Sequence, residues 1–287
     1  RLVFDARGMA ILVRDFLTAY GAACDGTLAP PTPAPGFGAY AQRHAQWLTL
    51  HESEGHTAYW RRRLGPDPLP PRLPTQRVTG AMRTAPTPAT DFTVSAEVAH
   101  RLAGLGRSAA ARQSDVLLAA FFVLLYRYTG QTAQYVAVSA DARPPDIRDT
   151  AIGPYETDQV CHIALDATES FESVLRTVVA ARTEAAPYAD LPFERLVEAV
   201  LPMLERDDGV GFDIAFRHFD PREARRPDTE AHVTAPDVPG PPAFGLSLET
   251  AERPDGTLNG CFRYRAETHE GAAIGWLCRH FTTLLHE

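Results

Sequence analysis

Within the first 26 residues, the apolar side chains follow two different spacings. Residues 2–4 are consecutive and apolar, which predicts a short buried strand leading into Asp5. Through residues 9–20 the apolar positions recur every three or four places, so we expect a helix with one apolar face. This helix should end at Gly21 or soon after, near residues 25–26.

Proline divides the chain before its strand-rich part. Residues 30–36 hold four prolines and indicate a connector. Residues 37–64 then predict one long helix, whose basic last turn suits the negative end of a helix dipole. Seven prolines within residues 65–90 exclude a regular helix or a central strand there. We therefore place a lobe boundary in this stretch and divide the chain into residues 1–80 and residues 81–287.

Beyond this boundary, strand and helix patterns alternate. Short apolar runs predict strands at residues 91–94, 134–140, 159–165, 212–219, 244–248 and 258–264, the last two as an antiparallel pair. Helical spacing predicts helices capped by Ser95 and Ser114, the second over residues 115–128, helices that begin at Ser170 and Pro192, and a last helix over residues 271–285. The helix after Ser114 is apolar on nearly all sides, so it should lie buried between layers and end at Gly130. Residues 220–242 form a long polar excursion, and the whole order predicts an α/β sandwich.

Composition and charge narrow the classes of function. The chain has 287 residues, of which 45% are hydrophobic and 22% charged, as in an ordinary globular protein. A net charge of −8 disfavours nucleic acid as a partner. No apolar run approaches the ~20 residues that span a bilayer, and no signal peptide opens the chain, so we expect a cytoplasmic protein without a membrane partner. The abrupt start suggests that the natural chain extends upstream, and the four unclustered cysteines fit buried thiols in a reducing compartment.

The residues alone offer little catalytic chemistry. The sequence contains no phosphate-binding glycine loop, no nucleophile elbow and no His-Glu-x-x-His metal helix. Ten histidines are scattered, and a surface or structural role is the first interpretation of each. Asp5 and Arg143 stand out because each follows an apolar strand, where a carboxylate and a guanidinium can form a two-pronged pair. Taken alone, they are more simply interpreted as two unrelated surface charges.

The order of several segments resembles the condensation domains of nonribosomal peptide synthetases. The matching segments are Asp5 with its helix, the run Tyr-Trp-Arg-Arg-Arg-Leu at 59–64, residues 117–131, 138–143, 152–153, 191–197 and 244–248, and the closing helix. The resemblance covers essentially the whole chain. It implies a chloramphenicol acetyltransferase-like, two-lobed α/β fold. Residues 1–80 are then the remainder of an incomplete N-terminal lobe, and residues 81–287 are the C-terminal lobe.

Condensation domains carry the motif His-His-x-x-x-Asp-Gly, whose second histidine is held to assist attack of an acceptor amine on a donor thioester. Counted back from Asp5, this histidine falls on Arg1, and a guanidinium stays protonated near neutral pH and cannot act as a general base. The resemblance implies that Asp5 is the structural aspartate of the motif and that Arg143 is its arginine partner. This is a scaffold pair, so no catalytic residue is carried over to the chain.

Further departures from the family lie near the motif. Ala6 stands where the family has glycine, which reduces backbone freedom there. The family commonly has Asn-Thr in the segment after Ile-Gly, and here that segment includes Glu156, Thr157 and Asp158. Two acids are thereby placed near the tunnel in which substrates meet. Together these changes indicate a domain that has lost condensation chemistry.

An arginine in place of the second histidine resembles the X-domains of glycopeptide antibiotic synthetases. These domains recruit cytochrome P-450 oxygenases, which cross-link aromatic side chains of the carrier-bound peptide. The partners implied are P-450 oxygenases, a peptidyl carrier domain with its peptide, and neighbouring synthetase domains. No metal or bound cofactor is expected on this chain, because a phosphopantetheine arm belongs to the separate carrier. The X-domain form usually has a second acid after the aspartate, where this chain has Ala6.

Two other interpretations stay open. The first is an active condensation or epimerisation-type domain, a transferase in which positioning alone or another group suffices for the chemistry. The second is an interface domain that recruits a different tailoring enzyme. Under recruitment, residues 220–229, which are rich in Arg and Asp, are one candidate docking segment, although a solvated loop is their simpler interpretation.

Overall fold

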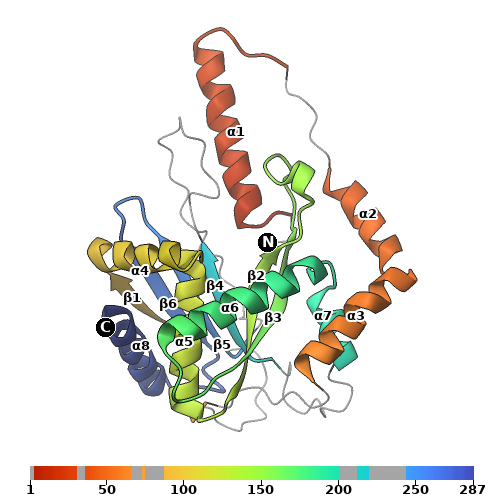
Figure 1. The fold of residues 1–287 in the computed structure, drawn as a ribbon. Coiled ribbons are helices and arrows are strands. Elements are labelled where there is room, and N and C mark those ends of the chain that lie inside the picture. The colour runs from red at the N-terminus through yellow and green to blue at the C-terminus, as the bar shows by residue number, and fades with distance from the viewer. Residues whose placement is uncertain (1–2, 31–35, 66–72, 75–86, 201–211, 220–243) are drawn as a thin grey trace.

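A mixed β-sheet organises the chain, and helices pack on it (Figure 1). The computed structural model describes residues 3–30, 36–65, 73–74, 87–200, 212–219 and 244–287. The excursion predicted at residues 220–242, and Arg1 itself, lie outside the described residues. The α/β class expected from the alternating pattern is confirmed.

The sheet has six strands in the order β1-β6-β5-β4-β2-β3. They are β1 (Ala89–Val94), β2 (Ala133–Asp141), β3 (Glu156–Ala164), β4 (Ile214–Phe219), β5 (Leu246–Glu252) and β6 (Leu258–Tyr264). Strands β2, β4 and β5 run parallel, whereas the pairs β1–β6, β5–β6 and β2–β3 are antiparallel. The six strands predicted beyond residue 80 are all confirmed, with ends that shift by a few residues.

Helices α4 (Ala96–Ser108), α5 (Gln113–Thr129), α6 (Phe171–Ala185) and α8 (Gly271–His286) share one hydrophobic core with the sheet. The short helix α7 (Phe193–Val200) follows α6. The prediction that α5 is buried nearly all round is confirmed, and Gly130 ends it with a left-handed φ of 66°. Its predicted cap at Ser114 is wrong, since the N-cap is Arg112. The helix begins at Gln113 because the Asp115 carboxylate accepts a hydrogen bond from the Arg112 N–H at 2.9 Å.

Phenylalanine rings from four elements meet where α8 packs against the sheet. Phe281 of α8 lies against Phe92 of β1, Phe121 of α5 and Phe262 of β6, with ring centroids 5.7, 6.3 and 5.8 Å away. Phe121, Phe262 and Phe281 are fully buried. Gly260 leaves room for the Phe92 ring, since a Cβ at this position would stand only 2.2 Å from it. This aromatic cluster fixes α8 on the core.

The first part of the chain forms the helices α1 (Ala6–Cys24), α2 (Phe37–Trp47) and α3 (His51–Leu64). The strand predicted before Asp5 is wrong for residues 3–4, and residue 2 lies outside the described residues. The chain cannot continue as a strand there, because Asp5 already caps α1 and its own N–H donates to Gly153 O at 3.3 Å. The predicted apolar face of α1 exists, but Leu12, Phe16 and Tyr20 on it are exposed.

The long helix predicted over residues 37–64 is broken into α2 and α3 by a turn at residues 48–50. The break brings the rings of Trp47 and His56 to within 4.8 Å. Along a continuous helix, nine residues would separate them by about 13 Å. The gain in aromatic packing therefore explains why the chain turns back at a place where no proline or glycine marks the sequence.

Aromatic and polar contacts hold α2 and α3 against the sheet domain, by which we mean the described residues from 87 onward. Tyr59 of α3 stacks on Tyr188 with ring centroids 3.7 Å apart, and His44 Nε2 of α2 lies 2.6 Å from Asp190 O. Trp60 and Leu64 are buried in a cluster that includes residues of α7. The described parts on the two sides of the proposed boundary thus pack together, and the division into two lobes stays a prediction.

Within the described ranges, no single helix is long and apolar enough to cross a membrane. Helices α4 and α5 pass that test of length and composition only as a pair, and they are bent by 100° relative to each other.

Stability should fall in mild acid because of His269, which precedes α8. This side chain is 2% exposed, and burial together with the nearby Arg265 charge lowers its pKa from 6.5 to about 4. In the unfolded chain the His269 imidazole takes up a proton below about pH 6.5, whereas in the folded chain it stays neutral down to about pH 4. Its contribution to the free energy of unfolding is therefore fully present above about pH 6.5 and is lost as the pH falls toward 4. Between pH 7 and pH 5 the titration of this group lowers the free energy of unfolding by about 2 kcal/mol.

Urea unfolding at the two pH values measures this loss. His269→Gln should flatten the pH dependence by about 2 kcal/mol, because the buried group no longer titrates. The exposed His100 of α4 supplies the control, and His100→Gln should leave the dependence unchanged. An equal slope in wild type and His269→Gln would rule out this assignment.

Candidate functional site

Asp5 joins the start of α1 to the connection between β2 and β3. Its Oδ1 accepts hydrogen bonds from the Gly8 N–H at 2.7 Å and from Arg143 Nη2 at 2.5 Å. Its Oδ2 accepts from the N–H groups of Tyr155 and Glu156, both at 2.9 Å. The carboxylate side chain is 5% exposed, so its charge is met almost entirely by donors inside the protein.

Most of the N–H donors of the Arg143 guanidinium are likewise bonded inside the protein. Besides Asp5, its Nη1 donates to Asp141 Oδ1 at 3.0 Å, its Nε to Ala151 O at 3.2 Å and its Nη2 to Gly153 O at 3.2 Å. Burial lowers the pKa of the guanidinium, but the bonds to the two aspartates outweigh this effect and raise it. With four of its five side-chain N–H donors directed at fixed partners, Arg143 supports the loop and is not arranged to bind a substrate.

The same loop also receives helix α2. A Cβ on Gly153 would stand 2.8 Å from the rings of both Phe37 and Tyr155, so this close approach requires glycine. The Tyr155 ring lies 5.0 Å from Phe37 and 4.8 Å from Tyr40, centroid to centroid. Burial raises the pKa of the Tyr40 hydroxyl to about 12, so it stays protonated at neutral pH. The Asp5–Arg143 pair thus anchors α1 and α2 to one point on the sheet domain.

The two acids noted in the sequence, Glu156 and Asp158, form an ion-paired bridge at the start of β3. Arg217 of β4 lies 3.2 Å from Glu156 Oε1 and 3.0 Å from both carboxylate oxygens of Asp158. Arg217 reaches them across β2, where Ser139 is the residue paired with Asp158. Thr157 alternates to the opposite face of the strand. The acids therefore hold strands together and are not free carboxylates.

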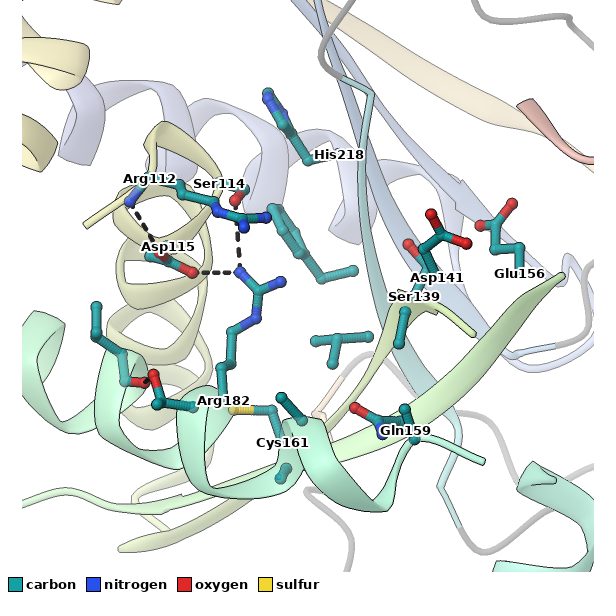
Figure 2. Close-up of a pocket in the computed structure, with 18 of the residues that line it drawn as sticks. Arg112, Ser114, Asp115, Ser139, Asp141, Glu156, Gln159, Cys161, Arg182 and His218 are labelled. Atoms are coloured by element: carbon teal, nitrogen blue, oxygen red, sulfur yellow. Dashed lines mark hydrogen bonds and ion pairs between the residues drawn. The ribbon is translucent and has the colours of Figure 1, made fainter. Parts of the chain in front are cut away.

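A cavity of about 950 Å³ opens beside the Asp5–Arg143 pair (Figure 2). It lies between the start of α1, helices α4, α5 and α6, and strands β2, β3 and β4. Small side chains line much of it, namely Ala6, Ala103, Ala111, Ala140, Ala181, Ala185, Ala186 and Ala189. Its volume is in the range of small-molecule sites in proteins.

Asp115 and Arg182, two charged groups on the helical wall of the cavity, pair with each other. Arg182 of α6 bonds the Asp115 carboxylate and lies 3.4 Å from Ser114 Oγ, as Figure 2 shows. Cys161 of β3 also lines the cavity, and burial raises its pKa to about 12, so it is a neutral thiol and a poor nucleophile. This wall provides shape and fixed charge pairs, without an activated nucleophile.

A histidine also lines the cavity, but away from Asp5. His218 of β4 lies apart from Asp141 and Glu156 in Figure 2, and its Nδ1 is 2.9 Å from Thr250 Oγ1. The carboxylates near Asp5 are engaged with arginines, since Asp141 bonds Arg143 and Glu156 bonds Arg217. In the described part of the cavity, no free side chain next to Asp5 is placed to act as a general base.

The structure brings together Asp5, Ala6, Arg143 and Glu156 on one wall of the cavity. The side chains at 157 and 158 are not part of its lining, and Arg1 lies outside the described residues. Sequence reasoning missed Asp141 and Arg217. Asp141 stands two residues before Arg143 at a strand end, and that spacing was an available signal. Arg217 had no signal, because its role depends on β4 lying next to β2.

Among the described residues, no three His, Cys, Asp or Glu side chains gather closely enough to hold a metal ion.

The family model of the condensation domain matches residues 2–287. The chain belongs to the condensation-domain family. Its relatives include Malpibaldin synthetase of Mortierella alpina, 26% identical over 95% of this chain and 5% of the relative. Phosphinothricin tripeptide synthetase PhsC of Streptomyces viridochromogenes is 29% identical over 95% of this chain and 25% of the relative. The chain thus spans a small part of the curated relatives that it matches.

Solved structures show the same fold. The first condensation domain of the calcium-dependent antibiotic synthetase, in complex with a substrate analogue, matches with a TM-score of 0.79 and 19% identity, over 99% of this chain and 63% of that one. The X-domain from teicoplanin biosynthesis matches with a TM-score of 0.76 and 22% identity, over 99% and 66%. The complex of this X-domain with OxyB also matches, with a TM-score of 0.74. At these identities the likeness concerns the condensation-domain fold alone.

Proposed function

We propose that this condensation-family chain is a non-catalytic, X-type domain of a cytoplasmic nonribosomal peptide synthetase. In this role it recruits cytochrome P-450 oxygenases to a carrier-bound peptide during glycopeptide-type antibiotic biosynthesis. The peptide stays on the phosphopantetheine arm of a separate carrier domain, and this chain carries no cofactor of its own. Its other contacts are with neighbouring synthetase domains.

The observation that carries the proposal is the state of the condensation motif. Arg1 stands where the family has its catalytic histidine, and an arginine cannot remove a proton near neutral pH. The cavity wall next to Asp5 offers no replacement base within the described residues, because Asp141 and Glu156 are tied to arginines. The scaffold pair of Asp5 and Arg143 is intact. A lost base together with an intact scaffold pair supports a domain that acts through its folded surface and not through catalysis.

The proposal is tested by titrating the complete domain with the P-450 oxygenases encoded beside it. We expect micromolar or tighter binding that survives moderate salt, because a recruiting surface must hold its partner without covalent help. The variant Arg1→His is the matched control. It should bind the oxygenases as wild type does, because recruitment does not depend on the residue at position 1. Absence of binding to every oxygenase tested would overturn the proposal.

A second candidate is an active condensation domain. It is favoured by the cavity of about 950 Å³ beside the motif and by relatives that are peptide synthetases. In that case a direct assay of the wild-type domain with loaded carriers forms product, through positioning or through another group such as His218. Product formation that is lost in His218→Ala would select this alternative over recruitment.

A further inference from the structure

Helix α8 has an outer side with a large exposed aromatic side chain. Its inner residues Ile274, Leu277 and Phe281 are completely buried. Trp276 faces the other way and is 56% exposed. Helix α8 lies at the margin of the molecule, at the end opposite to α1 (Figure 1). A solvent-exposed indole on an otherwise well-packed helix contributes little to the stability of the fold. Its exposure instead suits it to contact a binding partner.

The neighbours of Trp276 hold it in a defined arrangement. The Arg279 guanidinium lies 4.8 Å from the centre of the indole, in cation–π contact. The His280 ring is 6.2 Å from the indole, and its Nδ1 lies 2.8 Å from the Tyr128 hydroxyl of α5. We call Tyr128, Trp276, Arg279 and His280 the α8 outer face. Because the rings restrain one another, less conformational entropy is lost when a partner covers them.

The charge of the α8 outer face indicates the kind of surface that it fits. Arg279 forms no ion pair with any described residue, and neither does the exposed Arg127, which precedes Tyr128 in α5, in a chain whose net charge is −8. A two-fold contact between copies of this chain would bring two copies of this basic face together, which like-charge repulsion disfavours. A carboxylate-rich protein surface with a recess for an indole matches both features. Tryptophan, tyrosine and arginine are also the residue types that most often dominate binding energy at interfaces.

We propose that the α8 outer face is a docking site for the recruited oxygenase, which meets it with a carboxylate-rich surface. Trp276 is the apolar anchor, and Arg279 supplies the charge contact and orients the indole. This inference rests on the proposed function and adds a location to it. Its residues are other than 220–229, the docking segment suggested by the sequence, which lies outside the described residues.

The test is a titration of the same oxygenases with surface variants of the complete domain. Trp276→Ala and Arg279→Glu should each weaken binding at least about tenfold, and the loss in Arg279→Glu should shrink as salt is raised. Leu50→Ala and Arg176→Glu are the matched controls, since Leu50 is 52% exposed and the Arg176 side chain 66% exposed at other places on the surface. Both controls should bind as wild type does. Thermal melts should show all four variants folded.

The outcomes separate the two proposals. Binding by wild type that is unchanged in Trp276→Ala and Arg279→Glu overturns the docking site and leaves recruitment standing. Absence of binding by wild type overturns both. Sedimentation of the domain alone gives a further check, because loss of a dimer in Trp276→Ala would show that the α8 outer face joins two copies of this chain, contrary to the proposal.

Discussion

Replacing Asp5 by alanine should lower the free energy of unfolding by about 3–5 kcal/mol, as expected when one partner of a buried ion pair is removed. The Arg143 side chain is 1% exposed and would lose its shortest contact, at 2.5 Å. The N–H groups of Tyr155 and Glu156 would lose their acceptor as well. Asp141 can still neutralise part of the charge, which places the effect toward the lower end of this range.

Urea unfolding of single and double variants measures this effect. The double variant Asp5→Ala/Arg143→Met should lose less than the sum of the two single losses, because no buried guanidinium is left unpaired. Glu172→Ala is the control, since it removes one partner of the exposed pair with Arg176 and should cost less than about 1 kcal/mol. Strictly additive losses in the double variant would contradict the coupling.

Replacing Phe281 by alanine should cost about 3–5 kcal/mol, the usual range for an aromatic core residue. The ring is fully buried and touches Phe92, Phe121 and Phe262, which come from three other elements. Its loss leaves a cavity that rigid neighbours from the sheet and α5 cannot close. Urea unfolding, followed by circular dichroism, measures the change.

Phe281→Leu serves as the partner variant, because it keeps most of the buried volume and loses only the ring contacts. It should cost less than half of what alanine costs. Leu50→Ala, at an exposed site, should change stability by no more than about 0.5 kcal/mol. Equal losses in the leucine and alanine variants would show that ring geometry, rather than volume, dominates at this position.

Much of the sheet domain could be predicted from local pattern. The strand at residues 258–264 and the last helix show complete apolar periodicity, and the structure reproduces them within a residue or two. The pattern fails where contacts distant in sequence decide the conformation. The break between α2 and α3 follows from the packing of Trp47 on His56, and the missing strand before Asp5 follows from bonds to residues near 153. Neither cause has a local signature.

The candidate site shows the same division. Asp5 and Arg143 could be paired from the sequence only through the family resemblance, since 138 positions separate them. The acids at 156 and 158 looked like free charges in a tunnel. Whether a carboxylate is free depends on which strand lies two positions away in the sheet, and here that strand brings Arg217. Strand order is a property of the whole chain, so single-sequence reasoning could not supply it.

The position of Asp5 also has a kinetic consequence. Every partner of Asp5 outside its own helix comes from residues 143–156, so the bonds form only when a loop of more than a hundred residues closes. Closing such a loop costs about 4 kcal/mol of chain entropy by the logarithmic scaling of loop length. The hairpin of β2 and β3 must exist before this cost can be repaid, so the first helices join an already folded sheet late in folding. By the same reasoning, amide hydrogens of α1 should exchange before those of α5 in the native protein.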